Sequence, residues 1–198
     1  VKNKEFGCCV TAESAEYVTR EECSVAVIEE PGVNLTVEGF HESVLCSNDI
    51  LESECAKQHT TGCWEGKIYW YDSCGNRENI YSSDRRDSYN EGYALSDVDS
   101  CQINGANDPS CGNCNYALGT TCGPDTLNVM EEGEYSCIDL NCEETFEHDA
   151  SPLSGEARLN GESWCVYDSR PGDAGDLVGS RHYRHICING EEVVEQCA

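Results

Sequence analysis

"CQINGANDPSCGNCNYALGTTC", residues 101–122, combines four cysteines with turn-forming residues and little apolar bulk. The spacing C-x9-C-x2-C-x7-C allows three interpretations: a loop stapled by disulfides, a zinc site of four thiolates, or a redox pair at Cys111 and Cys114. Zinc sites normally use two tight pairs, and a redox pair needs a helix that starts after a strand. The Asn, Asp, Pro, Ser and Gly residues of this stretch favour turns instead. The pattern therefore favours a stapled loop, with zinc and redox chemistry as the alternatives.

Cysteines are frequent in the whole chain. Sixteen of its 198 residues are cysteines, and they are spread over the sequence instead of being gathered as one metal cluster requires. So many cysteines indicate an oxidising compartment, because cytosolic reductants would keep them reduced. The adjacent Cys8 and Cys9 are expected to bond two different partners. We predict up to eight disulfides among Cys8, Cys9, Cys23, Cys46, Cys55, Cys63, Cys74, Cys101, Cys111, Cys114, Cys122, Cys137, Cys142, Cys165, Cys187 and Cys197.

Charge is the second constraint. Thirty-eight Asp and Glu residues face twelve Lys and Arg residues, which gives a formal net charge of -26. Such a surface repels phosphate backbones and argues against nucleic-acid binding, but it attracts cations and basic partners. Self-repulsion also destabilises the compact state, and disulfides worth about 2–4 kcal/mol each can offset it.

The sequence is also typical of an exported chain. Apolar runs such as "SVAVI" and "EEVVE" are far shorter than a membrane span of roughly 20 residues. The chain opens with Val1 instead of Met, so we expect it to follow a removed signal peptide or to belong to a longer precursor. The expected location is extracellular or at the cell surface.

Local patterns predict short elements in the first half. Thr19 and Glu22 have the spacing of a capping box and predict a short helix, and Ser47 or Asn48 can cap a second one. Between them, residues 33–37 alternate as in a strand. Residues 68–71 and 80–81 predict a hairpin around the turn "SCGN". The polar stretch after this hairpin, residues 82–100, shows no clear period and is expected to be a loop.

The second half is expected to be mainly strands. A strand is predicted over residues 134–142, and another in "ESWCVYDS", residues 162–169, with Trp164 and Val166 on one face. "RHYRHICINGEEVVEQC" ends the chain with an Asn-Gly pair between two alternating runs, the pattern of a hairpin with a type I′ turn.

We therefore predict a mainly β fold with a few short helices, a small disulfide-rich α+β architecture of hairpins and long loops. The predicted domains are residues 1–62, a Cys-rich mixed α/β module, and residues 63–198, a Cys-rich module of β-hairpins, with one continuous domain as the alternative.

Few residues suggest chemistry, and we predict that the chain is not an enzyme. It contains no G-x-S-x-G nucleophile elbow, no H-E-x-x-H and no Gly-rich phosphate loop. Asp168, Asp173 and Asp176 lie in a Gly-rich stretch that suits Ca²⁺, although no Glu closes it as in a helical calcium loop, and a solvated turn is the alternative. No other cofactor is expected. Asn34 begins an N-x-T sequon and predicts a surface glycan.

Four stretches carry a resemblance. These are "FGCCVTAESAEYVTREEC", "TTGCWEGKIYWYDSCGNRENIY", "CGNCNYALGTTCG" and "NGESWCVYDSRPGDAGDLVGSRHYRHICINGEEVVEQC". Over most of its length the chain resembles Cys-rich secreted or surface proteins of small-genome archaea of the DPANN type. The resemblance implies an extracellular disulfide-rich module, often within a longer surface protein, and no particular activity or cofactor.

The predicted function is structural, as a subunit of a cell-surface filament or appendage. Edge strands such as "VNLTV" or "EEVVEQ" could pair with another copy or with other surface proteins, with Ca²⁺ or basic patches relieving the charge. The first alternative is an adhesion module that binds glycans or proteins through Trp64, Trp70 or Trp164. A less favoured alternative is an exported thiol oxidoreductase that uses Cys111 and Cys114.

Overall fold

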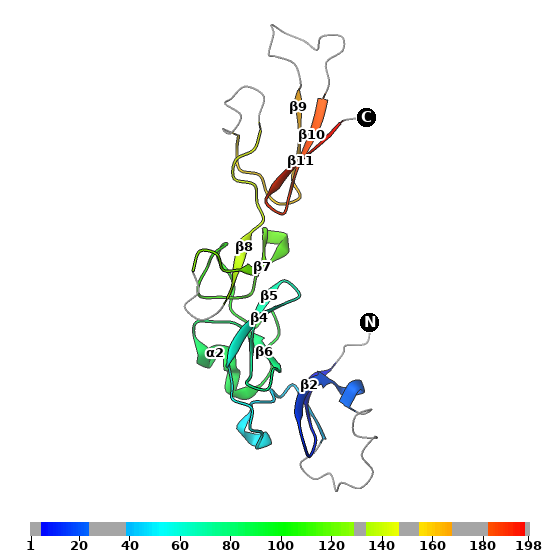
Figure 1. The fold of residues 1–198 in the computed structure, drawn as a ribbon, viewed down its shortest axis with the longest axis vertical. Coiled ribbons are helices and arrows are strands. Elements are labelled where there is room, and N and C mark those ends of the chain that lie inside the picture. The colour runs from blue at the N-terminus through cyan, green and yellow to red at the C-terminus, as the bar shows by residue number, and fades with distance from the viewer. Residues whose placement is uncertain (1–4, 24–38, 129–133, 147–154, 168–181, 197–198) are drawn as a thin grey trace. The chain divides into compact units, whose positions relative to one another are not determined.

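The computed structural model describes residues 5–23, 39–128, 134–146, 155–167 and 182–196 (Figure 1). It confirms a mainly β fold with a few short helices and many disulfides. None of the described helices is long and apolar enough to cross a bilayer.

The chain divides into two compact units. Unit 1 comprises Val1–Cys114 and Cys122–Cys137, and unit 2 comprises Asn115–Thr121 and Ile138–Ala198. The boundary expected between residues 62 and 63 lies within unit 1, because strand β4 and a disulfide both span that point.

The first sheet of unit 1 has the strand order β2-β1-β3 and is antiparallel. Its strands are β1 (Phe6–Val10), β2 (Ala15–Thr19) and β3 (Gly39–Glu42). The close approach of β3 requires a glycine on β1, since a Cβ at Gly7 would lie 2.1 Å from the His41 carbonyl oxygen. The predicted strand over residues 33–37 lies outside the described residues.

The predicted capping box directly follows β2 and is confirmed. The Thr19 N–H donates to Glu22 Oε2 at 2.8 Å, and the Glu22 N–H donates back to Thr19 Oγ1 at 3.3 Å. Residues 20–23 are helical. The second predicted helix is shorter than expected: only the 3₁₀ turn η1 (Asp49–Leu51) forms, capped by the Asn48 side chain.

The second sheet of unit 1 has the order β4-β5-β6. Its strands are β4 (Thr60–Trp64), β5 (Lys67–Tyr71) and β6 (Arg77–Ile80), so the hairpin predicted around "SCGN" is confirmed. Asp72 Oδ1 closes the turn by accepting hydrogen bonds from the N–H groups of Cys74, at 2.9 Å, and of Asn76, at 2.8 Å.

The polar stretch after β6 is not a plain loop. It contains helix α2 (Arg85–Tyr89) and the 3₁₀ turn η2 (Asn90–Gly92). Asp84 caps α2 by accepting hydrogen bonds from the N–H groups of Arg86 and Asp87. A further 3₁₀ turn, η3, spans Tyr116–Leu118.

The remaining strands form two small sheets. β7 (Thr120–Pro124) pairs with β8 (Tyr135–Asp139). β8 lies within residues 134–142, where the sequence predicts a strand, so that prediction is confirmed. In unit 2, β9 (Ser163–Tyr167), β10 (His182–Ile188) and β11 (Glu191–Gln196) have the order β11-β10-β9.

The hairpin between β10 and β11 is confirmed. Both turn residues have positive φ, 53° at Asn189 and 81° at Gly190, as a type I′ turn requires.

Among the described residues, seven disulfides connect these elements. Their pairs are Cys8–Cys46, Cys9–Cys23, Cys55–Cys74, Cys63–Cys122, Cys101–Cys111, Cys114–Cys137 and Cys142–Cys187. The adjacent Cys8 and Cys9 therefore reach different partners, as expected for neighbours in a strand, whose side chains point to opposite faces. The clusters of buried apolar residues are small, and both include disulfide cysteines.

Candidate functional site

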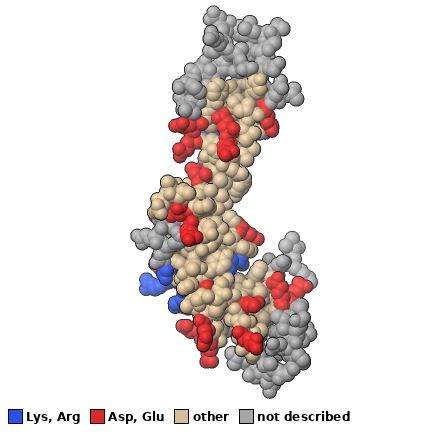
Figure 2. Space-filling model, viewed as in Figure 1, with Lys and Arg blue, Asp and Glu red and all other residues tan. Residues whose placement is uncertain are grey.

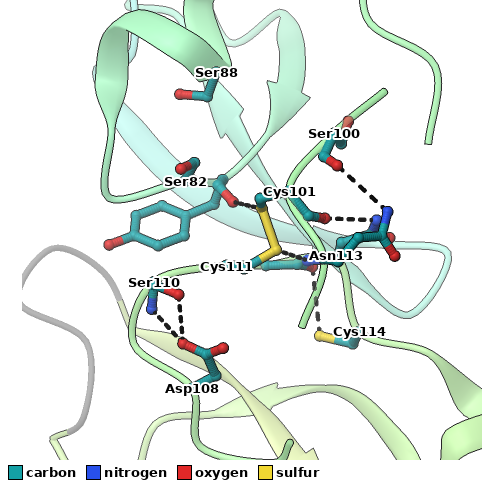
Figure 3. The surroundings of a disulfide bond; sticks show 12 residues. Ser82, Ser88, Ser100, Cys101, Asp108, Ser110, Cys111, Asn113 and Cys114 are labelled. Atoms are coloured by element: carbon teal, nitrogen blue, oxygen red, sulfur yellow. Dashed lines mark hydrogen bonds between the residues drawn. A yellow bond between two sulfur atoms is a disulfide. The ribbon is translucent and has the colours of Figure 1, made fainter. Parts of the chain in front are cut away.

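The stretch over residues 101–122 is a stapled loop. Cys101 bonds Cys111 (Figure 3). Cys114 and Cys122 bond partners outside the stretch, Cys137 and Cys63. The four cysteines therefore do not converge on a zinc ion. Cys111 and Cys114 do not bond each other either, and they are only 1% and 2% exposed. The redox alternative is wrong for this pair, because a thiol oxidoreductase needs an accessible thiol.

Hydrogen bonds hold the loop around this disulfide (Figure 3). The Asn113 amide donates to the carbonyl oxygens of Asp97, at 3.0 Å, and Cys101, at 2.9 Å, and accepts from the Lys67 ammonium. Asp108 accepts from the Ser110 hydroxyl at 2.6 Å. Burial alone would raise the pKa of Asp108, but the hydrogen bonds from Ser110 and from the Asn104 backbone lower it overall.

Two adjoining hollows in unit 1, which we call the α2 groove, share Asp87, Leu95 and Asp99. The smaller hollow has a volume of about 230 Å³ and the larger, open one about 980 Å³. The smaller is also lined by Ile80, Ser82, Ser88, Ser100 and Cys101. The larger is also lined by Asn48, Asp49, Lys57, Arg86, Tyr89, Asn90 and Glu91.

The lining of the α2 groove is mostly polar. It offers four carboxylates, three serine hydroxyls, two amides and two basic groups. The Lys57 ammonium lies 4.3 Å from the centre of the Tyr89 ring. Hydrogen-bonding side chains beside an aromatic ring are groups that could contact a polar ligand such as a glycan.

A buried carboxyl lies next to this groove. Glu78, 5% exposed, accepts hydrogen bonds from the Ser47 hydroxyl and from the Gln58 N–H, the latter at 2.7 Å. The Gln58 side chain in turn donates to Ser88 of α2 at 2.9 Å. Burial raises the pKa of Glu78, and the two hydrogen bonds oppose that rise. Glu78 therefore connects β6 with the segments that contain Ser47 and Gln58.

Comparisons with protein-family models, curated proteins and solved structures find no match for this chain.

The three tryptophans proposed for ligand binding differ in accessibility. Trp70 is 2% exposed and packs on Tyr81 in the core, so it is not available to a ligand. Trp64 is half-buried, with the Arg77 guanidinium 3.4 Å from its ring centre. Trp164 is also half-buried, and its indole N–H donates to the Phe146 carbonyl at 3.1 Å.

Several predicted site residues lie outside the described part of the chain. These are the sequon residue Asn34, the candidate calcium ligands Asp168, Asp173 and Asp176, and Cys197. Cys165 is exposed and has no disulfide partner among the described residues.

One compact group of potential metal ligands occurs among the described residues, Cys55, Asp72 and Cys74. Its two sulfurs bond each other, and Asp72 accepts the hydrogen bonds of the β5–β6 turn. This arrangement accounts for the group without a metal.

Proposed function

We propose that this chain is an extracellular structural protein, a subunit of a cell-surface filament or appendage. The observation that carries the proposal is the set of seven disulfides, which occur in both units. Disulfides in such numbers persist outside the reducing cytosol and give durability to a protein with a small core.

The small core supports this view. The larger buried cluster in unit 1 has five fully buried members, Ile68, Trp70, Tyr81, Cys114 and Cys137, and two of them are disulfide cysteines. Cross-links of this kind suit a protein that is exposed for long periods and is not replaced quickly.

Assembly requires relief of the charge. Figure 2 shows Asp and Glu side chains on this face of both units and few Lys or Arg side chains. Copies with a net charge of -26 repel one another, so we expect divalent cations or basic partners to support association. Asp168, Asp173 and Asp176 are our proposed calcium ligands, and a glycan on Asn34 would add to the surface.

Electron microscopy tests the proposal. Purified protein is imaged with calcium, with a chelator, and with a variant in which the three aspartates become asparagines. Ordered assemblies are expected with calcium and fewer with the chelator or the variant. Monomers alone under every condition, or detection of the native protein only inside its cells, would overturn the structural role.

A binding module is the second candidate, and the α2 groove is the observation that favours it. A glycan array with the protein, with Asp87→Asn/Asp99→Asn and with Glu13→Gln/Glu16→Gln separates this function from a structural one. Loss of a signal in the groove variant alone would support binding, since Glu13 and Glu16 are exposed acids far from the groove in sequence. No signal above background with the unchanged protein would count against glycan recognition.

A further inference from the structure

The outer edge of β11 has no backbone partner among the described residues. β11 is the end strand of its sheet, and β10 occupies one side of it (Figure 1). Within the part of the chain that the structure describes, no backbone hydrogen bond joins residues 191–196 to anything beyond β10. Such an edge presents N–H and C=O groups that can pair with an added strand.

Most of the usual features that prevent strand addition are missing from β11. Its pairing with β10 is regular over six residue pairs, from Ile188–Glu191 to Tyr183–Gln196, and has no bulge. The strand "EEVVEQ" contains no proline and no lysine, the residues that commonly protect an edge. Among the described residues, the protection that this edge has is negative charge.

The side chains of β11 combine exposed valines with carboxylates. Val193 and Val194 point to opposite faces of the sheet and are 38% and 53% exposed. Glu191 and Glu195 share the face of Val193 and are exposed. The charge on that face is only partly balanced by Arg184, which lies opposite Glu195 on β10.

Glu192 differs from the other two glutamates because it is already engaged on the opposite face. One carboxylate oxygen bonds His185 Nδ1, and the other accepts from the Phe146 N–H at 3.0 Å. The exposed Glu191 and Glu195 are therefore the groups left to select a partner.

In the register centred on Val193, these charges disfavour a second copy of β11 as the added strand. In an antiparallel pair of two β11 strands centred on Val193, Glu191 of one copy lies opposite Glu195 of the other. Like charges directly opposite each other destabilise a sheet, whereas opposite charges stabilise it. A strand with Lys or Arg at those positions converts both contacts into attractive ones.

We propose that the outer edge of β11 binds an extended segment of a different protein, with alternating basic and apolar side chains, by antiparallel strand addition. The backbone supplies the pairing, Val193 and Val194 supply apolar contact, and Glu191 and Glu195 select for lysine or arginine. This inference rests on the proposed function, since it names the kind of neighbour that a surface subunit would recruit.

Peptide binding tests the inference with the whole chain. The probe is a seven-residue peptide in which lysine and valine alternate, and its control carries the same side chains with N-methyl groups along one backbone edge. Binding is followed by amide chemical shifts and hydrogen exchange. We expect protection of β11 amides by the probe, at least tenfold weaker binding of the control, and at least threefold weaker binding to Glu191→Gln/Glu195→Gln than to Glu13→Gln/Glu16→Gln.

Three results would overturn the inference. They are equal affinity for both peptides, which indicates charge attraction alone, unchanged β11 amides, and dimerisation of the free chain through β11. Assemblies seen by electron microscopy together with a failed peptide test would remove this inference and leave the structural role intact. Peptide binding together with the absence of assemblies under every condition would remove the structural role and leave strand addition at β11 intact.

Discussion

Loss of the Cys142–Cys187 bond is the sharpest test of how unit 2 is held together. It is the only disulfide within unit 2 among the described residues, and its sulfurs are buried. The bond closes a loop with a sequence separation of 45, and no other described disulfide lies inside that loop. In the chain-entropy model, opening such a loop costs about 4 kcal/mol at room temperature.

The perturbation is Cys142→Ala/Cys187→Ala, and alanine is chosen because a serine would bury an unpaired hydroxyl. The matched control is Cys101→Ala/Cys111→Ala in unit 1, where the sequence separation is 10 and the same model gives about 3 kcal/mol. Native-state hydrogen exchange of the β10 amides measures the free energy of opening unit 2, and that of the β5 amides reports on unit 1.

In the unit 2 variant we expect the opening free energy of β10 to fall by about 4 kcal/mol, or protection to vanish if unit 2 is less stable than that. In the control, β10 should keep its protection while β5 loses some. A loss below about 1 kcal/mol in β10 would refute the reasoning. Packing around His185 and Trp164, not the covalent bond, would then hold the sheet.

Three further changes have defined expectations. Burial raises the pKa of Glu78, so the folded state holds this proton more tightly than the unfolded chain. The stability that this shift contributes is complete below the ordinary Glu pKa and is lost as pH rises through the raised pKa of Glu78, with a slope of at most about 1.4 kcal/mol per pH unit. Glu78→Gln should flatten that slope in urea unfolding measured at pH values above the ordinary Glu pKa. Gly190→Ala places a side chain at φ 81° and should cost about 1–2 kcal/mol in thermal unfolding, whereas Gly105→Ala, whose Cβ meets nothing within 4 Å, should cost less. Asp84→Ala removes the α2 cap and should cost about 1 kcal/mol by urea unfolding, whereas Asp84→Asn should restore most of it.

The sequence predicts best where the chemistry is local. The Asn189-Gly190 turn needs positive φ at two adjacent residues, and few other residue pairs tolerate that. The Thr19 and Glu22 capping box likewise depends on groups three residues apart. Both predictions are confirmed because neighbours in the chain suffice to decide them.

The disulfide pairing could not be predicted, because it depends on which strands lie side by side. Cys8 reaches Cys46 across a separation of 38 residues, and nothing in the spacing distinguishes that partner from the others. Only the divergence of Cys8 and Cys9 could be predicted, since adjacent residues of a strand point to opposite faces.

The α2 groove and the buried carboxyl of Glu78 could not be predicted from the sequence either. Glu78 is one of 38 acidic residues, and it is selected only by distant partners, Ser47 and Gln58. The sequence contains one signal that predicts helix α2: Asp84, directly before it, is a favourable N-cap residue. Its five residues are too few for a periodic pattern to emerge from the surrounding polar stretch.

Most of the described basic residues lie over aromatic rings. The structure describes eight Lys and Arg residues, and five of them lie over an aromatic ring. These five are Arg20, Lys57, Arg77, Arg85 and Arg158. The guanidinium carbon of Arg77 lies within 6 Å of four ring centres, those of Phe6, Tyr17, Trp64 and Tyr69.

Arg20 and Arg158 also form ion pairs with the nearby carboxylates of Glu5, Glu42 and Glu162. Screening limits the reach of each cation to about 8–10 Å, so these cations do not neutralise carboxylates farther away. The excess of acidic groups is therefore left for solvent ions or for another protein to neutralise. This expectation is shared by calcium-dependent assembly and by a basic strand on β11, but the two respond differently to a chelator. Monovalent salt should weaken both, because both depend on charge attraction, whereas a chelator added at constant ionic strength should abolish calcium-dependent assembly and leave binding of the basic peptide unchanged.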